Sequence, residues 1–527
     1  MIKMELTAQA ARMRRIALGD LVYRSARTFG ERSAVVDGAI RLNYTELDAL
    51  SSQFAHYLLE RVGSGHQIGM LCSNSADMLV AVNGIHKSGN VWVPINTKLE
   101  LATIDYSLRH AEVSCVVVDE AIRTQVGMAA LLQALAVPLV ITMGDCADTS
   151  ATTLAQARHG RASNLPEVEI DGNAPALLMY TSGTTGNPKG VVHTHLSVYS
   201  AVMGNIANFG LTHEDSFTGL LPLFHCAQHV LAASACAVGA SMVLARAFIP
   251  GDIARLVCEE KVTIFVGLPM MYAALLADKT YATPDYSAMR LCIYAMAPMP
   301  QPLIQAIAAK MAPKILLATG QTEIYPITMS FDAMANPGRD ANYWGLSGVA
   351  CETAIMDDDG HFLPNGQVGE IVHRGPNVML GYYKDPEATA AAQKYGWHHT
   401  GDLGMFDSGG QMLFLDRKKD MIKTGGENVA SVKVEAAILA HPDVAGVAVI
   451  GLPHPRWSEA VCAFIVRKPG TRCDEAAIIA HCRTRLGGFE VPKAVRFVDV
   501  LPATATGKIQ KHVLRRAHQI EWDDATA

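Results

Sequence analysis

Short apolar runs alternate with amphipathic stretches through the first four hundred residues. Four runs rich in β-branched residues predict buried strands: IGMLCSN (68–74), SCVVVDE (114–120), PLVITMG (138–144) and VTIFVGLP (262–269). The stretches TELDALSSQFAHYLLERV (45–62) and SVYSAVMGNIANFG (197–210) place apolar residues at helical spacing and predict amphipathic helices. This alternation is typical of an α/β fold in which helices cover layered sheets.

The pattern changes near residue 417. The charged, glycine-containing stretch DRKKDMIKTGGENV (416–429) is followed by a helix pattern, VKVEAAILAHPDV, and by two strand patterns, GVAVIGL and AVCAFIVRK. A chain of 527 residues also exceeds what one hydrophobic core usually supports. We therefore expect a large N-terminal domain of several subdomains over residues 1–418, and a small, mobile α+β domain over residues 419–527.

Composition excludes several classes of protein. With 50% hydrophobic and 18% charged residues the chain is globular, and a net charge of -6 argues against nucleic-acid binding. The eleven cysteines include no C-x-x-C pair, which favours buried reduced thiols. The two histidines of HTH (193–195) have the wrong spacing for metal ligands on one helical face.

The lengths of the apolar runs indicate where the protein is located. No apolar run approaches the roughly 18 residues of a membrane span, and the N-terminus lacks the apolar core of a signal peptide. We expect a cytoplasmic protein without a transmembrane segment. Peripheral membrane contact and a homodimer are both left open.

One loop carries candidate chemistry. In YTSGTTGNPKG (180–190), Gly183 and Gly186 are only three apart and Lys189 precedes a glycine, so the spacing is not that of a P-loop. The loop follows an apolar strand, APALLMY, and precedes a helix expected from about His195. In such a strand–loop–helix passage, backbone N–H groups converge on an anion, and the hydroxyls and the lysine add donors. Taken alone, a loop of this composition is more often an ordinary turn.

Six further stretches follow this loop in the chain. They are LPLFHCAQ (221–228), GQTE (320–323), GEIVHRGPNVMLGYY (369–383), GWHHTGD (396–402), DRKKDMIKTGGENV (416–429) and PATATGKIQK (502–511). Together with the loop, they resemble the motifs of the adenylate-forming (ANL) superfamily, in its acyl-CoA synthetase or fatty acid–CoA ligase branch. The resemblance implies an ATP-dependent acid–CoA ligase that uses ATP, Mg²⁺ and coenzyme A. It would form an acyl adenylate and pyrophosphate, and then an acyl-CoA and AMP.

The resemblance also implies roles for residues of the large domain. The loop would clamp the β- and γ-phosphates through Thr181, Ser182, Gly183, Thr184, Thr185, Gly186 and Lys189. Within GQTE, which begins at Gly320, Thr322 would donate to the α-phosphate and Glu323 would bind Mg²⁺. His225 would lie near the reacting carboxylate as a gate, and Ala297, in YAMAPMP, would line the nucleotide pocket.

Further roles fall toward the C-terminus. Asp402 would bind the ribose hydroxyls, and Arg417 would make a second ribose or phosphate contact. Lys508 would bridge the attacking carboxylate and the α-phosphate, where negative charge develops. Lys419 would be the hinge of the small domain. The thiol carrier would meet the loop that contains Lys423, Gly425 and Gly426.

Two positions depart from the family pattern. Thr319 stands where an aromatic residue usually stacks on adenine, and Met296 replaces a small residue beside the acyl pocket. The apolar residues near that pocket favour a medium- or long-chain fatty acid as the substrate. An aryl acid–CoA ligase and a stand-alone ligase that loads a carrier protein are the alternatives. A non-catalytic nucleotide-binding homologue is a more distant one.

Overall fold

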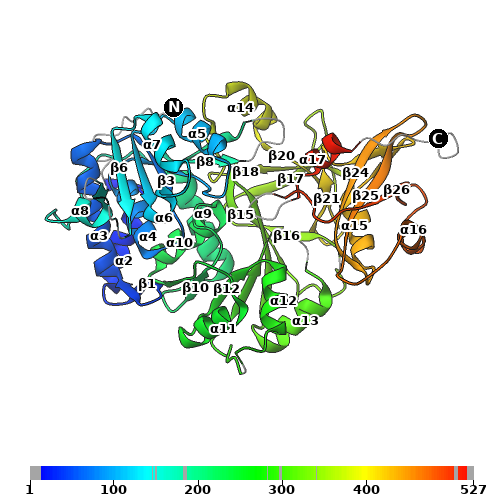
Figure 1. The fold of residues 1–527 in the computed structure, drawn as a ribbon, viewed down its shortest axis with the longest axis horizontal. Helices are drawn as coiled ribbons and strands as arrows, with labels where there is room; N and C mark the ends of the chain where they lie inside the picture. The colour runs from blue at the N-terminus through cyan, green and yellow to red at the C-terminus, as the bar shows by residue number, and fades with distance from the viewer. Residues whose placement is uncertain are drawn as a thin grey trace. The chain divides into compact units, whose positions relative to one another are not determined.

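The computed structural model describes residues 13–144, 146, 148, 151–181, 187–281, 283–295, 299–339, 341–503 and 509–518. The chain divides into two compact units, whose course along the sequence Figure 1 shows by colour. Unit 1 comprises Met1–Thr353 and His373–His398, and unit 2 comprises Ala354–Val372 and His399–Ala527. Each unit has its own hydrophobic core.

The first sheet of unit 1 has the strand order β19-β9-β8-β4-β3-β5-β6-β7. Its strands are β3 (Gln67–Leu71), β4 (Val91–Pro94), β5 (Cys115–Asp119), β6 (Leu139–Met143), β7 (Thr152–Thr153), β8 (Pro175–Thr181), β9 (Lys189–Thr194) and β19 (Gly381–Tyr382). From β8 to β7 neighbouring strands are parallel, whereas β9 is antiparallel to both β8 and β19. Cys115 and Val117 of β5 belong to one core, and Val116 and Val118 belong to another. The strand reads as a continuous apolar run because both of its faces are buried.

Helices pack against this sheet. Helix α3 (Tyr44–Arg61) packs on α4 (Ala76–Lys87), and Figure 1 shows both in blue beside the cyan strands. The start of α3 is fixed by a capping box, in which Asn43 and Glu46 each accept the other's backbone N–H. The other helices of this region are α5 (Leu101–His110), α6 (Glu120–Arg123), α7 (Met128–Leu135) and α8 (Leu154–Arg158).

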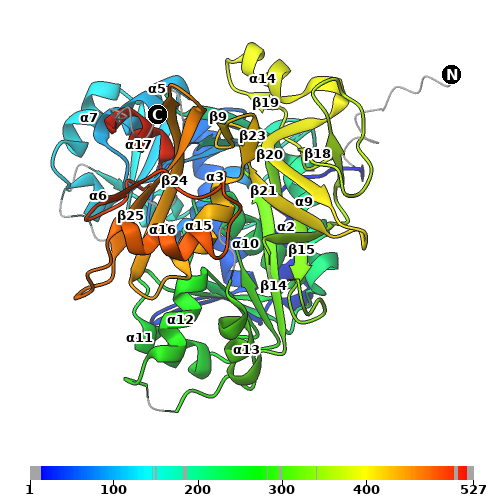
Figure 2. The ribbon, with the colours of Figure 1, turned by 90° about the vertical axis from the view of Figure 1, so that its right-hand side faces the viewer.

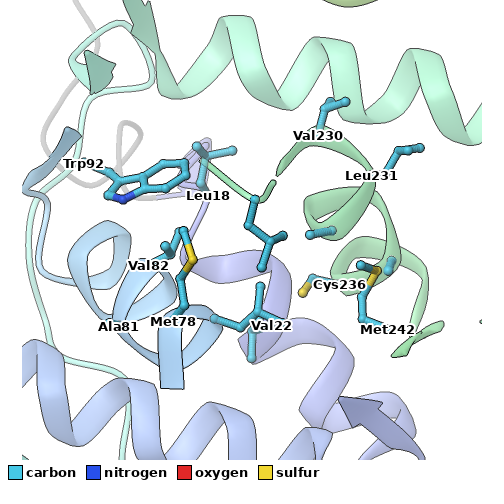
Figure 3. Packing of buried hydrophobic residues seen from close by; sticks show 14 of the residues in the cluster. Leu18, Val22, Met78, Ala81, Val82, Trp92, Val230, Leu231, Cys236 and Met242 are labelled. Carbon is cyan, nitrogen blue, oxygen red and sulfur yellow. The ribbon is translucent and has the colours of Figure 1, made fainter. Parts of the chain in front are cut away.

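The largest core of unit 1 joins segments far apart in the sequence. Helix α2 (Asp20–Phe29) packs on α10 (Cys226–Val238), which also packs on α9 (His195–Phe209). Figure 3 shows Val22, Val82, Val230 and Met242 meeting in this core near Trp92. One core therefore unites α2, α9 and α10, which are far apart in the sequence.

The second sheet of unit 1 runs β16-β15-β14-β13-β12-β10-β11-β1-β2. Its strands are β1 (Ser33–Asp37), β2 (Ile40–Asn43), β10 (Ser216–Gly219), β11 (Ser241–Leu244), β12 (Ile264–Gly267), β13 (Leu291–Tyr294), β14 (Lys314–Gln321), β15 (Ile324–Asp332) and β16 (Tyr343–Ser347). Strands β1, β11, β10, β12, β13 and β14 are parallel to their neighbours in this series, and β15 returns antiparallel to β14. The remaining helices of unit 1 are α11 (Pro250–Glu259), α12 (Pro269–Ala277), α13 (Gln301–Lys310), α14 (Pro386–Ala392) and the 3₁₀ turn η1 (Lys394–Gly396).

Unit 2 contains most residues of the strand series β17 (Glu352–Met356), β18 (Gly369–Arg374), β20 (His398–Phe406) and β21 (Met412–Arg417). It also contains a five-stranded sheet of β22 (Ile422–Thr424), β23 (Glu427–Val429), β24 (Val444–His454), β25 (Ser458–Arg467) and β26 (Ala494–Phe497). Helices α15 (Ser431–Leu439) and α16 (Glu475–Arg483) lie together in orange in Figure 2, and α15 packs on β24.

Residues of β24 alternate between the two faces of that sheet. Val447 and Val449 join the core that holds residues of α15 and α16, whereas Ala448 and Ile450 join the core that holds Leu514 of α17 (Lys511–Ala517). Because successive side chains of a strand point to opposite faces of the sheet, β24 packs against helices on both faces.

The α/β fold class predicted from the sequence is confirmed, with a large N-terminal part of several sheets and a small C-terminal part. The four strand runs and the two amphipathic helices predicted from the alternating pattern of the first four hundred residues are present. All eleven cysteines are free thiols. Within the described ranges, no helix has the length and hydrophobicity that a membrane span needs. The boundary at residues 418 and 419 concerns movement about a hinge and stays a prediction.

Candidate functional site

Strands β8 and β9 form an antiparallel hairpin in unit 1, and the glycine- and hydroxyl-rich sequence lies between them along the chain. Thr181 ends β8, Lys189 begins β9, and the two residues are paired in the antiparallel ladder. The Thr181 hydroxyl donates to the Lys189 carbonyl at 3.5 Å. The loop residues Ser182, Gly183, Thr184, Thr185 and Gly186 lie outside the described residues.

The expected strand–loop–helix passage is therefore wrong in one respect. Helix α9 does begin at His195, but the six residues of β9 (Lys189–Thr194) separate it from the loop. A helix dipole acts within its first turn, so α9 does not supply positive potential to the loop. Lys189 is the charge that the hairpin itself brings to this end of the sheet.

Glu323 lies in a tight turn between β14 and β15, close to the hairpin. Its Oε1 atom accepts a hydrogen bond from the Tyr382 hydroxyl at 3.0 Å, and the Lys189 Nζ atom lies 4.8 Å from the centre of the Tyr382 ring. Burial and the Glu323 carboxylate both raise the pKa of Tyr382, so the phenol stays protonated and donates. Lys189 and Glu323, predicted from separate motifs, are thus joined through Tyr382.

The sequence assigned Tyr382 no role, although it belongs to the quoted stretch GEIVHRGPNVMLGYY. Its place becomes evident only when β19 pairs with β9, with Tyr382 opposite Val191. That pairing joins segments almost two hundred residues apart, and the sequence pattern carries no signal for it.

Thr322 and His225 lie in one neighbourhood. Cys226, the first residue of α10, places its Sγ atom 3.8 Å from the Thr322 hydroxyl, and His225 precedes it as the residue that caps the helix. Burial lowers the pKa of His225, which keeps its imidazole neutral. The His225 Nε2 atom is buried and has no hydrogen-bond partner among the described residues. This geometry brings two predicted residues together from motifs a hundred residues apart.

Gly320 and Thr319 precede that turn. A Cβ atom on Gly320 would lie 2.5 Å from the Pro326 Cβ atom, so the chain reversal requires glycine here. The Thr319 hydroxyl donates to the Met329 carbonyl of the neighbouring strand at 3.5 Å. Ala297 and Met296 lie outside the described residues.

A second group of predicted residues lies in unit 2. Asp402 on β20 is opposite Arg417 on β21, and the Arg417 Nε atom lies 3.3 Å from Asp402 Oδ1. Asp402 is only 2% exposed. Beside the pair is an open cleft of about 340 Å³, lined by Thr400, Gly401, Arg417, Lys418 and Lys419. A volume of this order accommodates a small ligand or part of a larger one.

The remaining predicted residues of unit 2 form a hairpin. Gly425 and Gly426 join β22 to β23, with φ of 61° and 86°. Both values are left-handed, as a two-residue hairpin turn of the primed type demands. Lys423 is exposed, and its backbone N–H donates to the Glu459 carboxylate at 2.7 Å. Lys508 lies outside the described residues, and the hinge role of Lys419 stays a prediction.

Comparison with known proteins gives two matching family models. The model described as AMP-binding enzyme matches residues 22–383, and the model described as AMP-binding enzyme C-terminal domain matches residues 433–508.

Individual proteins match along almost the whole chain. A feruloyl-CoA synthase of an Amycolatopsis species is 33% identical over 509 residues, which cover 96% of this chain and 99% of that protein. The long-chain-fatty-acid–CoA ligase FadD13 of Mycobacterium tuberculosis is 33% identical over 490 residues, 91% of this chain and 93% of that protein. The crystal structure of ATP-bound MatB from Rhodopseudomonas palustris has a TM-score of 0.85 at 29% identity, covering 95% of this chain and 98% of that one.

Proposed function

Because the chain belongs to the AMP-binding enzyme family of acid–CoA ligases, we propose that it activates a hydrophobic carboxylic acid. The first candidate for this acid is a medium- or long-chain fatty acid. The acid attacks the α-phosphate of ATP, giving an acyl adenylate and pyrophosphate. The thiol of coenzyme A then displaces AMP and leaves an acyl-CoA. The adenylate is needed because a carboxylate is anionic and has no adequate leaving group.

The observation that carries the proposal is the cluster of Lys189, Tyr382 and Glu323 in unit 1. Attack on ATP brings a carboxylate toward a polyphosphate, and the repulsion between them must be offset by fixed cationic and donor groups. Lys189 supplies a positive charge at the end of the hairpin. The Thr322 hydroxyl supplies a donor next to Glu323, in the turn between β14 and β15. We assign both to the phosphates.

The Glu323 carboxylate fits Mg²⁺, which prefers hard oxygen ligands and usually binds through one or two carboxylates plus phosphate oxygens. Tyr382 engages Oε1 and thereby orients the group. Bound there, Mg²⁺ would neutralise charge on the phosphate oxygens.

Asp402 and Arg417 suit the ribose of the nucleotide. A buried carboxylate can accept hydrogen bonds from two vicinal hydroxyls, and the Arg417 Nε atom lies 3.3 Å from Asp402 Oδ1. The cleft of about 340 Å³ offers space beside them. We keep Lys508 as the adenylation lysine, and Lys423, Gly425 and Gly426 as the segment that meets coenzyme A.

The acid is the open part of the proposal. The neutral, half-buried His225 beside Phe224, whose ring centre lies 4.8 Å from its own, suits an apolar acid with its carboxylate at the imidazole. An aryl acid is the second candidate, since the relative named for ferulate matches as closely as the one named for long-chain fatty acids. A cytoplasmic location and a homodimer stay predictions.

The test is a coupled assay. The purified protein is mixed with ATP, Mg²⁺, coenzyme A and a panel of fatty and aryl acids, and AMP and acyl-CoA are quantified by liquid chromatography. AMP and a matching acyl-CoA in equal amounts support the proposal. AMP without a CoA thioester would instead favour a ligase that loads a carrier protein. No pyrophosphate exchange with any acid would favour a nucleotide-binding homologue without catalysis.

A further inference from the structure

The turn that carries Thr322 and Glu323 lacks the residues that two-residue hairpin turns prefer. The pair Gln321 and Ile324 closes a two-residue hairpin between β14 and β15. Two-residue hairpins favour glycine or asparagine with left-handed φ. Here the two central residues are threonine and glutamate, and neither has a positive φ. The position of the Glu323 carboxylate must therefore be fixed from outside the turn.

Hydrogen bonds from other segments hold it. The Thr322 carbonyl accepts from the His193 Nε2 atom at 2.6 Å, and the Glu323 carbonyl accepts from the Met379 N–H at 2.8 Å. Next to the turn, Tyr325 exchanges two bonds with Asn377: its N–H donates to the Asn377 carbonyl at 2.9 Å, and the Asn377 side chain donates to its carbonyl at 3.1 Å.

The surroundings of His193 fix the protonation and the orientation of its ring. It is fully buried on β9, and burial lowers its pKa to about 4, so the ring is neutral near pH 7. A neutral imidazole has one N–H, and because a carbonyl only accepts, the proton is on Nε2. The Nδ1 atom then accepts from the Ser197 hydroxyl at 3.2 Å, and the Tyr325 ring packs edge to face at 4.8 Å.

His193 also connects two parts of the site. It lies four residues after Lys189 on the same strand, and residues separated by an even number share a face of a strand. The strand that begins with the phosphate-binding lysine therefore carries, on the same face, the ring that bonds to the turn with Glu323.

We propose that His193 is a positioning residue: its Nε2–H bond to the Thr322 carbonyl sets the place of the Thr322 hydroxyl and the Glu323 carboxylate relative to Lys189. The role in binding magnesium and nucleotide rests on the proposed function. The role in holding the turn does not.

Matched variants separate this role from general damage. His193→Leu removes the donor at similar volume, and His193→Gln keeps an N–H near the place of Nε2. His195→Leu is the control, because His195 is equally buried two residues further on but bonds to the Leu18 N–H at 3.3 Å instead of the turn. It removes a bond of similar kind from the same region of the fold.

The first measurement needs no ligand. Hydrogen–deuterium exchange is followed by mass spectrometry on a peptide that spans residues 318–326. His193→Leu should speed its exchange about tenfold, the effect of one net hydrogen bond, with His193→Gln near the unmodified protein and His195→Leu unchanged. Equal exchange in His193→Leu and the unmodified protein would overturn the proposal, as would equal acceleration in His195→Leu.

The second measurement is calorimetric titration with the non-hydrolysable nucleotide α,β-methylene-ATP, with Mg²⁺ and with EDTA. With Mg²⁺, His193→Leu should bind the nucleotide about tenfold more weakly than the unmodified protein does. In EDTA, the two affinities should agree within about threefold, because the misplaced group is the metal ligand. An equal loss in EDTA would overturn the link to Glu323. Should the unmodified protein bind no nucleotide, the proposed function fails, while the exchange result still decides the positioning role.

Discussion

The buried histidines of unit 1 should make it sensitive to acid, and His86 offers the sharpest test. His86 is 2% exposed, and its two ring nitrogens have no hydrogen-bond partner among the described residues. The rings of His229, His195 and Trp92 surround it, with centres 6.0, 6.1 and 6.4 Å away. Burial holds the pKa of His86 well below its ordinary value.

The sign follows from proton binding. Below about pH 6.5 an unfolded chain protonates this histidine, while the native state keeps it neutral, so the free energy of unfolding falls as the pH falls. A histidine that stays neutral in the native state down to pH 5 lowers the free energy of unfolding by about 1.6 kcal/mol between pH 6.5 and pH 5. Burial acts in the same direction on four more histidines, lowering the pKa of His193 and His195 to about 4 and of His229 and His373 to about 3.

The perturbation is His86→Leu, which nearly conserves volume and leaves no ring nitrogen unpaired. The free energy of unfolding is measured with urea at pH 6.5 and pH 5.0, followed by tryptophan fluorescence. Between the two pH values, the free energy of unfolding should fall by about 1.6 kcal/mol less in the variant than in the unmodified protein. His159→Gln, at an exposed histidine, is the control and should follow the unmodified protein. If His86→Leu loses as much stability on acidification as the unmodified protein does, His86 is not a source of the acid sensitivity.

Three substitutions test the site directly. Gly320→Ala places a Cβ atom 2.5 Å from that of Pro326 and should destabilise the protein by about 1–3 kcal/mol in urea unfolding; a neutral effect would contradict the close approach. Tyr382→Phe removes the hydroxyl 3.0 Å from Glu323 and should raise the Mg²⁺ concentration for half-maximal pyrophosphate exchange about tenfold; an unchanged requirement would count against this orientation of the carboxylate. Asp402→Asn should weaken the binding of ATP by about tenfold or more, and the binding of 2′,3′-dideoxy-ATP much less. Equal losses of affinity for the two nucleotides would exclude a ribose contact.

Much of the fold could be predicted from the sequence. The runs around Ile68 and Val117 are strands because their continuous apolar residues are buried on both faces. The helix from Tyr44 to Arg61 follows from its spacing and its capping box. These signals are local, so a reading of short windows finds them.

The site was predicted only in part, because its geometry depends on contacts between distant segments. Thr181, Lys189, Thr322 and Glu323 stood in recognisable motifs. Tyr382, however, joins Lys189 and Glu323 only through the pairing of β19 with β9. Strand β9 was missed because its six residues were interpreted as part of the passage from the loop to the helix at His195. Propensity in a short window cannot show that such a segment pairs with β8.

Isotope exchange distinguishes a route through an acyl adenylate from other routes to an acyl-CoA. The protein is incubated with ATP, Mg²⁺, labelled pyrophosphate and each acid of the panel, without coenzyme A, and label in ATP is measured. Coenzyme A is then added and acyl-CoA is quantified. We expect exchange that depends on a hydrophobic acid, followed by an acyl-CoA of the same acid. Acyl-CoA formation that releases ADP and phosphate, with no acid-dependent exchange, would contradict the route through an acyl adenylate.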